Sequence, residues 1–287
     1  MRVSIRTKLF LAMVAVSLSF IGLSLYLMDR FVGRIAEREV SAALRRGLLA
    51  YERFAALRST LIAARSRSLA QAPHLRAVMN VPDVDHQTAL FTAGELSPAA
   101  ESDLMLLLDV RGRLLAEVDA PSDWGDDLSA QPGVEAGLNG IESVTFWRYR
   151  ERPYRVAVTP IALADQLLGL LVLGERYDAE AAAELREVTG QEVLIAEGDS
   201  VLAESLGDPG PRAVQREEVR RLLAVDGGTV PPHPVRGIMG GQEALAAVVP
   251  LDGTAGRVVL FRGLHSLTRE ILVLRVSILA AGGVSAV

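Results

Sequence analysis

The hydrophobic pattern of the chain opens with an uncharged apolar run from Leu9 to Met28. A run of about 20 residues is the length of helix that crosses the hydrocarbon core of a bilayer. Basic residues precede the run, and positive charge before a first span favours a cytoplasmic N-terminus. We therefore predict a transmembrane helix over residues 9–28, with residues 1–8 on the cytoplasmic side. A cleaved signal peptide is the alternative, but its apolar region is usually shorter, about 7–15 residues.

Helix-forming residues continue after this run. From Phe31 to about Ala72 there is no proline, and only Gly33 and Gly47 interrupt the strong helix formers. Apolar residues recur at or near spacings of three and four, which is the pattern of an amphipathic helix. We expect a long helix within residues 31–80, which can serve as a stalk, as a dimer seam or as a wall for a sheet. The heptad pattern is not strict enough to predict a coiled coil.

The hydrophobic period changes at Asp103, where short apolar segments separated by turn residues indicate strands. We expect a first module over residues 103–178, built from a hairpin, a short helix between Gly133 and Gly140, and a three-stranded meander. The strands of this module are predicted at Leu104–Leu108, Leu114–Val118, Ser143–Tyr149, Tyr154–Leu163 and Leu167–Tyr177. A helix over Ala179–Thr189 leads out of the module.

The same order of elements then repeats in reduced form over residues 190–263. Strands are predicted at Gln191–Ala196, Ser200–Glu204, Gln242–Pro250 and Arg257–Gly263, with a helix over Pro211–Val225. The fold class is therefore α+β, with a long N-terminal helix followed by two modules of antiparallel sheet. Residues 271–287 are apolar again, and we expect them to be the start of a second transmembrane helix that has been cut off; a C-terminal helix packed on the domain is the alternative.

Composition excludes several classes of function. The formal net charge is −5, which gives no reason to expect nucleic acid as a partner. There is no cysteine, and the four histidines are widely separated, so neither a disulfide framework nor a metal-ligand spacing is present in the sequence. The sequence carries no nucleophile elbow, phosphate-binding loop or dinucleotide fingerprint. We therefore predict neither a catalytic residue nor a metal or cofactor, and we do not expect an enzyme.

The chain resembles the double Cache family of extracytoplasmic sensors over about residues 31–268. The resemblance lies in the long helix, in the two successive PAS-like modules, and in the segments LMLLLDVRGRLLA (104–116), GVEAGLNG (133–140), VAVTPIAL (156–163) and LLGLLVLGERYD (167–178). It implies a double Cache domain over residues 29–268, with 103–178 membrane-distal and 190–263 membrane-proximal. It also implies a homodimer in the bacterial inner membrane, with the main domain periplasmic.

The segment from Phe146 to Arg155 holds an unusual share of the few aromatic residues and several arginines. If Glu151-Arg152 is a two-residue turn, Tyr149 lies opposite Tyr154 and Arg148 lies opposite Arg155. Side chains alternate between the faces of a strand, so the aromatics share one face and the two arginines the other. Arginine is the preferred partner of carboxylates and phosphates. We predict a site for a small, anionic ligand at Trp147, Arg148, Tyr149, Tyr154 and Arg155; a solvated arginine ladder over an aromatic core is the alternative.

The amino-acid-binding members of the family carry a signature that Trp147-Arg148-Tyr149 does not match in spacing, so the resemblance does not support an amino-acid ligand. Taken together, the sequence predicts the ligand-sensing input region of a membrane receptor of the sensor kinase, cyclase or chemoreceptor type, without its output module. A membrane-anchored structural or assembly protein with PAS-like modules but no ligand remains an alternative, and so does an anchored extracytoplasmic enzyme.

Overall fold

The computed structural model describes residues 5–198, 200–205, 216–224, 234–251 and 256–264. The chain divides into two compact units, one made of Met1–Ala43 and Gly263–Val287 and the other of Leu44–Arg262. In the described part of the first unit the chain is the beginning of α1 (Ile5–Ala70). Within the described residues, no helix meets the length and apolarity needed to cross a membrane. The apolar C-terminal segment over residues 271–287 lies outside the described residues.

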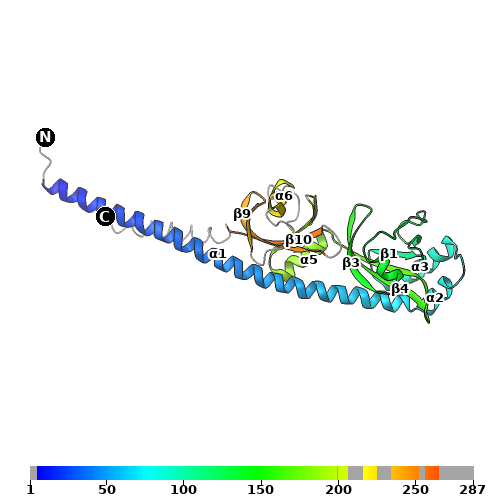
Figure 1. Ribbon diagram of the computed structural model, residues 1–287. Coiled ribbons are helices and arrows are strands. Elements are labelled where there is room, and N and C mark those ends of the chain that lie inside the picture. The colour runs from blue at the N-terminus through cyan, green and yellow to red at the C-terminus, as the bar shows by residue number, and fades with distance from the viewer. Residues whose placement is uncertain (1–4, 199, 206–215, 225–233, 252–255, 265–287) are drawn as a thin grey trace. The chain divides into compact units, whose positions relative to one another are not determined.

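The second unit contains two five-stranded antiparallel sheets (Figure 1). The first sheet consists of β1 (Leu104–Leu108), β2 (Leu114–Glu117), β3 (Ser143–Tyr149), β4 (Arg152–Leu163) and β5 (Gln166–Arg176). Its strand order is β2-β1-β5-β4-β3. Three shorter helices belong to this module, α2 (Pro73–Met79), α3 (His86–Ala100) and α4 (Val134–Leu138).

The second sheet repeats this topology. After α5 (Ala179–Thr189) come β6 (Glu192–Glu197), β7 (Ser200–Glu204), α6 (Arg216–Ala224), β8 (Val235–Met239), β9 (Gln242–Pro250) and β10 (Gly256–Gly263). The strand order β7-β6-β10-β9-β8 is that of the first sheet, element for element. The repetition of element order in the sequence is therefore a repetition of topology, and the predicted α+β class is confirmed.

Three differences from the predicted elements have local causes. The long helix ends at Ala70, and Pro73 begins a separate helix because proline fits the first turn of a helix but not its interior. β8 has no counterpart among the predicted strands, since it follows a Gly/Pro-rich stretch and contains Gly237. The start of the helix predicted over 211–225 lies outside the described residues, and α6 is described from Arg216.

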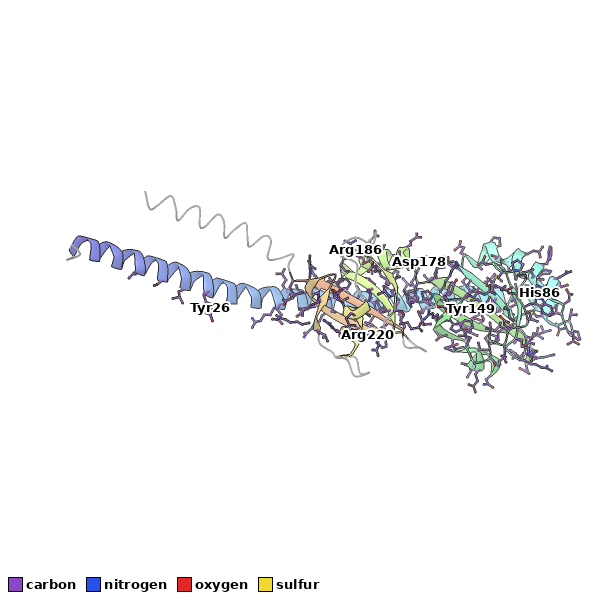
Figure 2. All side chains as sticks on the ribbon, turned by 90° about the horizontal axis from the view of Figure 1, so that it is seen from above. Tyr26, His86, Tyr149, Asp178, Arg186 and Arg220 are labelled. Carbon is purple, nitrogen blue, oxygen red and sulfur yellow. The ribbon has the colours of Figure 1, made fainter. Side chains whose placement is uncertain are left out.

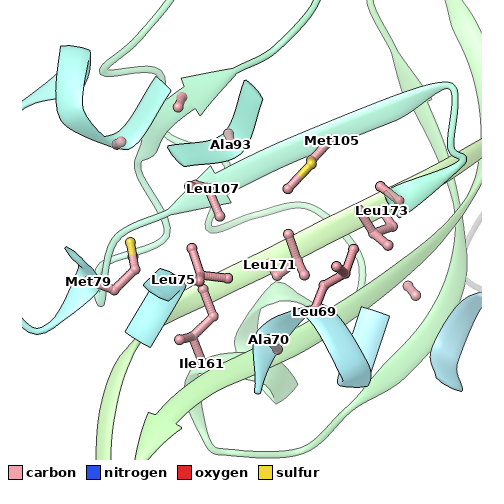
Figure 3. Packing of buried hydrophobic residues seen from close by; sticks show 14 of the residues in the cluster. Leu69, Ala70, Leu75, Met79, Ala93, Met105, Leu107, Ile161, Leu171 and Leu173 are labelled. Carbon is pink, nitrogen blue, oxygen red and sulfur yellow. The ribbon is translucent and has the colours of Figure 1, made fainter. Parts of the chain in front are cut away.

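Both faces of the first sheet are covered. On one face, apolar residues of α1, α2 and α3 pack against β1, β4 and β5 to form a core that includes Leu69, Leu75, Leu107 and Leu171 (Figure 3). On the other face, the residues between β2 and β3 contribute Leu128 and Val134 to a second core. The two cores divide β1 by alternation, with Met105 and Leu107 in the first and Leu104, Leu106 and Leu108 in the second.

Gly169 marks a place where the backbone leaves no room for a side chain. It lies in β5 opposite Ile161, beside an irregularity in the β4–β5 register. A Cβ atom at this position would lie 2.4 Å from the carbonyl oxygen of Leu108 and 2.5 Å from the Cε atom of Met79. We expect Gly169→Ala to lower the free energy of unfolding by about 2–3 kcal/mol, because the strands must separate to admit the methyl group.

The measurement is urea unfolding of the full chain, with Gly94→Ala as the control. Gly94 lies in α3 with no atom within 4 Å of a built Cβ, so its replacement should be neutral or stabilising by up to about 1 kcal/mol. Equal unfolding midpoints for the two variants would show that β5 adjusts freely at this point.

Candidate functional site

The hairpin of β3 and β4 carries all five predicted site residues. Its turn is Arg150-Glu151, with φ angles of +48° and +62°, rather than the predicted Glu151-Arg152. Positive φ at both central residues is the requirement of a type I′ hairpin turn. Trp147 consequently lies opposite Tyr154, and Arg148 opposite Pro153. The predicted pairing was wrong by two positions, and a slip of two leaves every side chain on its predicted face.

The three aromatic residues of the predicted site share one face of the sheet and are buried there. Trp147, Tyr149 and Tyr154 belong to the same core cluster, together with Val156 and Val158. The indole N–H of Trp147 donates a hydrogen bond to the carbonyl oxygen of Pro132 at 2.7 Å. These side chains fix the hairpin against the segment between β2 and β3.

A buried polar cluster lies at the edge of this aromatic face. The hydroxyl of Tyr149 (labelled in Figure 2) donates to Oε2 of Glu117 at 2.8 Å, and both residues are buried. The guanidinium of Arg150 pairs with Glu117 at 2.6 Å and with Asp123 at 2.7 Å. Burial raises the pKa of Glu117, although Tyr149 and Arg150 act in the opposite direction. The contacts of Arg150 account for the turn's placement, because they hold this residue in its left-handed conformation.

Arg155 lies on the opposite face of the sheet and is only 8% exposed. Its guanidinium donates a hydrogen bond to the hydroxyl of Tyr177 at 2.7 Å and lies 3.6 Å from Oε2 of Glu175. Burial raises the pKa of Tyr177, while the positive charge of Arg155 lowers it. Tyr177 also contacts Phe146, with ring centroids 5.8 Å apart.

Glu175 joins this face to α1. Its Oε2 atom lies 3.7 Å from Nε of Arg58, and Arg58 in turn donates a hydrogen bond to Glu184 of α5 at 3.2 Å. The same carboxylate oxygen is buried and has no hydrogen-bond partner within the described residues. Glu175 is therefore held by charge alone, between two guanidinium groups, at distances longer than a hydrogen bond.

Arg155 and Tyr177 line a cavity of about 220 Å³. Three parts of the chain form its walls: α1, the first sheet with the residue that follows it, and the end of β9. The lining residues are Tyr51, Glu52, Ala55 and Ser59 of α1; Val144, Thr145, Phe146, Arg155 and Tyr177 of the first sheet and its end; and Val249, Pro250 and Leu251 at the end of β9. The cavity thus combines apolar and polar walls with a buried guanidinium, and Glu52 contributes a carboxylate from α1. Apolar surface with a few placed polar and charged groups is the usual composition of a small-molecule site. It also lies where both sheets and α1 meet.

Arg148 shares a face with Arg155 but has different partners. It donates to Oε2 of Glu197, at the end of β6, at 3.0 Å, and it pairs with Glu151. The structure therefore does not bring the five predicted residues into one pocket. Arg155 lines the cavity, Arg148 connects the two sheets, and the three aromatics are buried on the far face.

Sequence reasoning did not identify Tyr177, Glu175, Arg58 or Glu117 as parts of these clusters. Glu117 and Glu175 are charged residues at the ends of largely apolar strands, and this position is the one feature of the sequence that could have indicated their role. Arg58 gave no comparable signal, because its partners are distant in sequence.

Comparison with known proteins identifies the fold. No protein-family model and no curated protein matches the chain. Among solved structures, the ligand-binding domain of the Campylobacter jejuni chemoreceptor Tlp3, in complex with 4-methylisoleucine, matches with a TM-score of 0.54 and 11% identity, over 82% of this chain and 94% of that domain. The sensor domain of the V. cholerae histidine kinase DctB matches with a TM-score of 0.52 and 13% identity, over 78% of this chain and 98% of that domain.

The extracellular domain of the putative histidine kinase vpHK1S-Z8 matches with a TM-score of 0.51 and 11% identity, over 84% of this chain and 96% of that one. These neighbours are extracytoplasmic sensor domains with two PAS-like sheets. The predicted resemblance is confirmed at the level of the fold: the chain has the architecture of the double Cache sensors.

Proposed function

We propose that this chain is the ligand-sensing input region of a membrane signal-transduction protein and that it binds a small anionic ligand beside Arg155. The observation that carries the proposal is a buried arginine on the wall of a cavity of about 220 Å³. A buried charge is costly unless it is paired. Among the described residues, Arg155 makes one hydrogen bond, to a neutral tyrosine, and its ion pair with Glu175 is long, at 3.6 Å. A ligand carboxylate or phosphate would supply the bidentate partner that Arg155 lacks.

Such a ligand would act on the contact between the sheet and α1. Its anionic group would compete with Glu175 for Arg155, and Glu175 would then interact mainly with Arg58. Because Arg58 is also bonded to Glu184, a change at Glu175 would reach α5, which leads into the second sheet. A ligand shifts such an equilibrium only by its difference in affinity for the two states.

The other predicted site residues have supporting roles in this proposal. Arg148 adds positive charge on the same face and ties β3 to Glu197 of the second sheet. Trp147, Tyr149 and Tyr154 hold the hairpin in place from the opposite face. The five residues would therefore act together, although only Arg155 faces the cavity.

Membrane attachment and an extracytoplasmic location are part of the same proposal. They rest on the apolar run at 9–28 and on the described side chains Val16, Phe20, Leu23 and Tyr26, which are each 56% exposed or more. Spacings of four and three place these four residues along one side of α1, where an apolar environment would cover them. An output module of the kinase, cyclase or chemoreceptor type would then receive the signal in the cytoplasm.

We also propose that the chain forms a homodimer through α1. Leu49, Leu57 and Leu61 are 55%, 56% and 48% exposed on this helix, at spacings of eight and four. A stripe of exposed leucines on a helix that already buries its other side is the surface that a second copy would cover.

The ligand proposal is tested by replacing both arginines, Arg148 and Arg155, with glutamine. A panel of inorganic phosphate and small mono- and dicarboxylates is tested first for anions that raise the unfolding temperature of the wild-type chain. A saturating ligand at about 100 times its Kd stabilises by about 2.7 kcal/mol, and this gain should be lost in the double variant. Wild-type affinity in the double variant would contradict the proposal.

Two further variants separate binding from folding. Arg155→Gln is combined with Glu175→Gln so that no unpaired carboxylate remains, and it should fold yet still fail to respond to the anion. Arg152→Gln, which removes an exposed arginine from the same strand, should respond as the wild type does.

The dimer proposal is tested with Leu57→Lys combined with Leu61→Lys. We expect this variant to sediment as a monomer at concentrations where the wild-type chain is a dimer, because each lysine would place a charge in the apolar seam. Val188→Lys, at an exposed apolar position of α5, is the matched control and should remain dimeric. Identical masses for the two variants would place the interface elsewhere.

A further inference from the structure

His86, the first residue of α3, has both ring nitrogens bonded to backbone carbonyls (its position is labelled in Figure 2). Its Nδ1 atom lies 2.6 Å from the carbonyl oxygen of Leu115 and its Nε2 atom lies 2.7 Å from that of Pro121. Leu115 belongs to β2, and Pro121 belongs to the segment that follows it, residues 118–125, which we call the β2 loop. The imidazole therefore bridges the strand and its loop.

A carbonyl oxygen can only accept a hydrogen bond. A neutral imidazole has one N–H group and one nitrogen lone pair. It can therefore donate a hydrogen bond to one of these two carbonyl oxygens, while its lone pair repels the lone pairs of the other. The imidazolium carries two N–H groups and satisfies both, with charge-assisted bonds. We propose that His86 is a proton-sensing group that fastens the β2 loop in its doubly protonated state and releases it when it loses a proton.

The rest of the loop supports the same arrangement. Trp124 stacks on the imidazole, with ring centroids 5.4 Å apart and an angle of 15° between the planes. Trp124 is 62% exposed, so the stack is open to solvent and protons reach it freely. Farther along, Asp123 is held by Arg150, which also binds Glu117. The loop is thus held by the side chains of His86 and Arg150 and by the backbone hydrogen bond from Gly125 to the carbonyl oxygen of Leu114 at 2.8 Å. Of these contacts, the one at His86 is the one that depends on a histidine.

The charges around His86 come from several elements. On α3 itself, Asp85 is the N-cap, and its hydrogen bonds with Thr88 lower its pKa, so it is anionic throughout the relevant range. The N-terminus of α3 opposes a positive ring. The charged and titratable groups of the neighbouring elements are Glu117 on β2, Asp119, Asp123 and Asp126 in or next to the loop, Arg150 on the β3–β4 turn, His74 and Arg76 on α2, and Glu95 on α3. β1, which also packs on α3, contributes none.

The number of hydrogen bonds that His86 makes determines how the attachment of the β2 loop depends on pH. Protonated His86 makes two bonds and neutral His86 makes one, so the doubly protonated ring holds the loop and loss of a proton from the ring releases it. Histidine is the side chain that ordinarily changes charge between about pH 5 and 8. The module would therefore respond to acidification through the β2 loop, independently of any ligand beside Arg155.

Hydrogen exchange of the full chain tests this directly, with His86→Gln compared with wild type at each pH. The glutamine amide retains one hydrogen bond, as a neutral ring would. At pH 5 we expect amides within residues 116–124 to exchange roughly tenfold or more faster in the variant, the effect of losing a charge-assisted bond. At pH 8 the two proteins should exchange alike. Equal exchange at pH 5 would overturn the proposal.

Tryptophan fluorescence gives a second readout, because the chain has only two tryptophans. Imidazolium stacked on indole quenches its emission, so emission from Trp124 should rise with pH in the wild type and stay constant in His86→Gln and in Trp124→Phe. His74→Gln, which removes the histidine of α2 that pairs with Glu95 of α3, should retain the transition. A transition that persists in His86→Gln would assign it to another group and refute the role of His86. Neither readout involves a ligand, so failure here leaves the ligand proposal intact.

Discussion

Burial of sheet faces against α1 is the constraint on which the second unit depends. A five-stranded sheet exposes two apolar faces, and each must be covered to be stable in water. In the first module, α1 supplies Ile62, Leu69 and Ala70 to one face, while the segment between β2 and β3 covers the other. Farther back along α1, Gly47 comes so close to Thr189 and Gln191 that a Cβ atom would lie 3.1 Å from the Thr189 carbonyl oxygen. The backbone of α1 therefore lies close to the segment that joins α5 to β6.

Close packing of this kind explains why the charged network lies where it does. Arg155 and Glu175 lie opposite each other on neighbouring strands, and Glu175 also pairs with Arg58 of α1. Buried charges are tolerated only in pairs, and Arg58 from α1 completes the balance by contacting both Glu175 and Glu184. The pairs involving Glu175 are long, at 3.6 Å and 3.7 Å, so the network is neutral but not fully hydrogen-bonded.

Alternation along the chain was enough to predict most of the fold. β1, β3, β7 and β9 have the predicted bounds, because each is an apolar segment between clear turn residues. The sheet face on which Trp147 and Arg155 each lie was also predictable, because successive side chains of a strand point to opposite faces. The pairing partners were not, because the β3–β4 turn contains neither glycine nor asparagine, and the choice of Arg150-Glu151 depends on contacts of Arg150 with Glu117 and Asp123. Those contacts, like that of Arg58 with Glu184, join residues far apart in sequence, and no local pattern encodes them.

The two proposed inputs act on different parts of one sheet, the β2 loop and the wall beside Arg155, and the β3–β4 hairpin connects them. Tyr154 is buried on the aromatic face and the adjacent Arg155 on the face toward α1, so a displacement of β4 moves both. Glu117, the last residue of β2, links this hairpin to the β2 loop, because it binds Tyr149 and Arg150 at the hairpin's turn. If fastening of the loop by His86 favours one position of the hairpin, an anion beside Arg155 that favours the same position binds more tightly in acid. By linkage the anion would then raise the proton affinity of His86 by the same factor. Opposite preferences would give antagonism of equal size, and in either case the coupling passes through the hairpin.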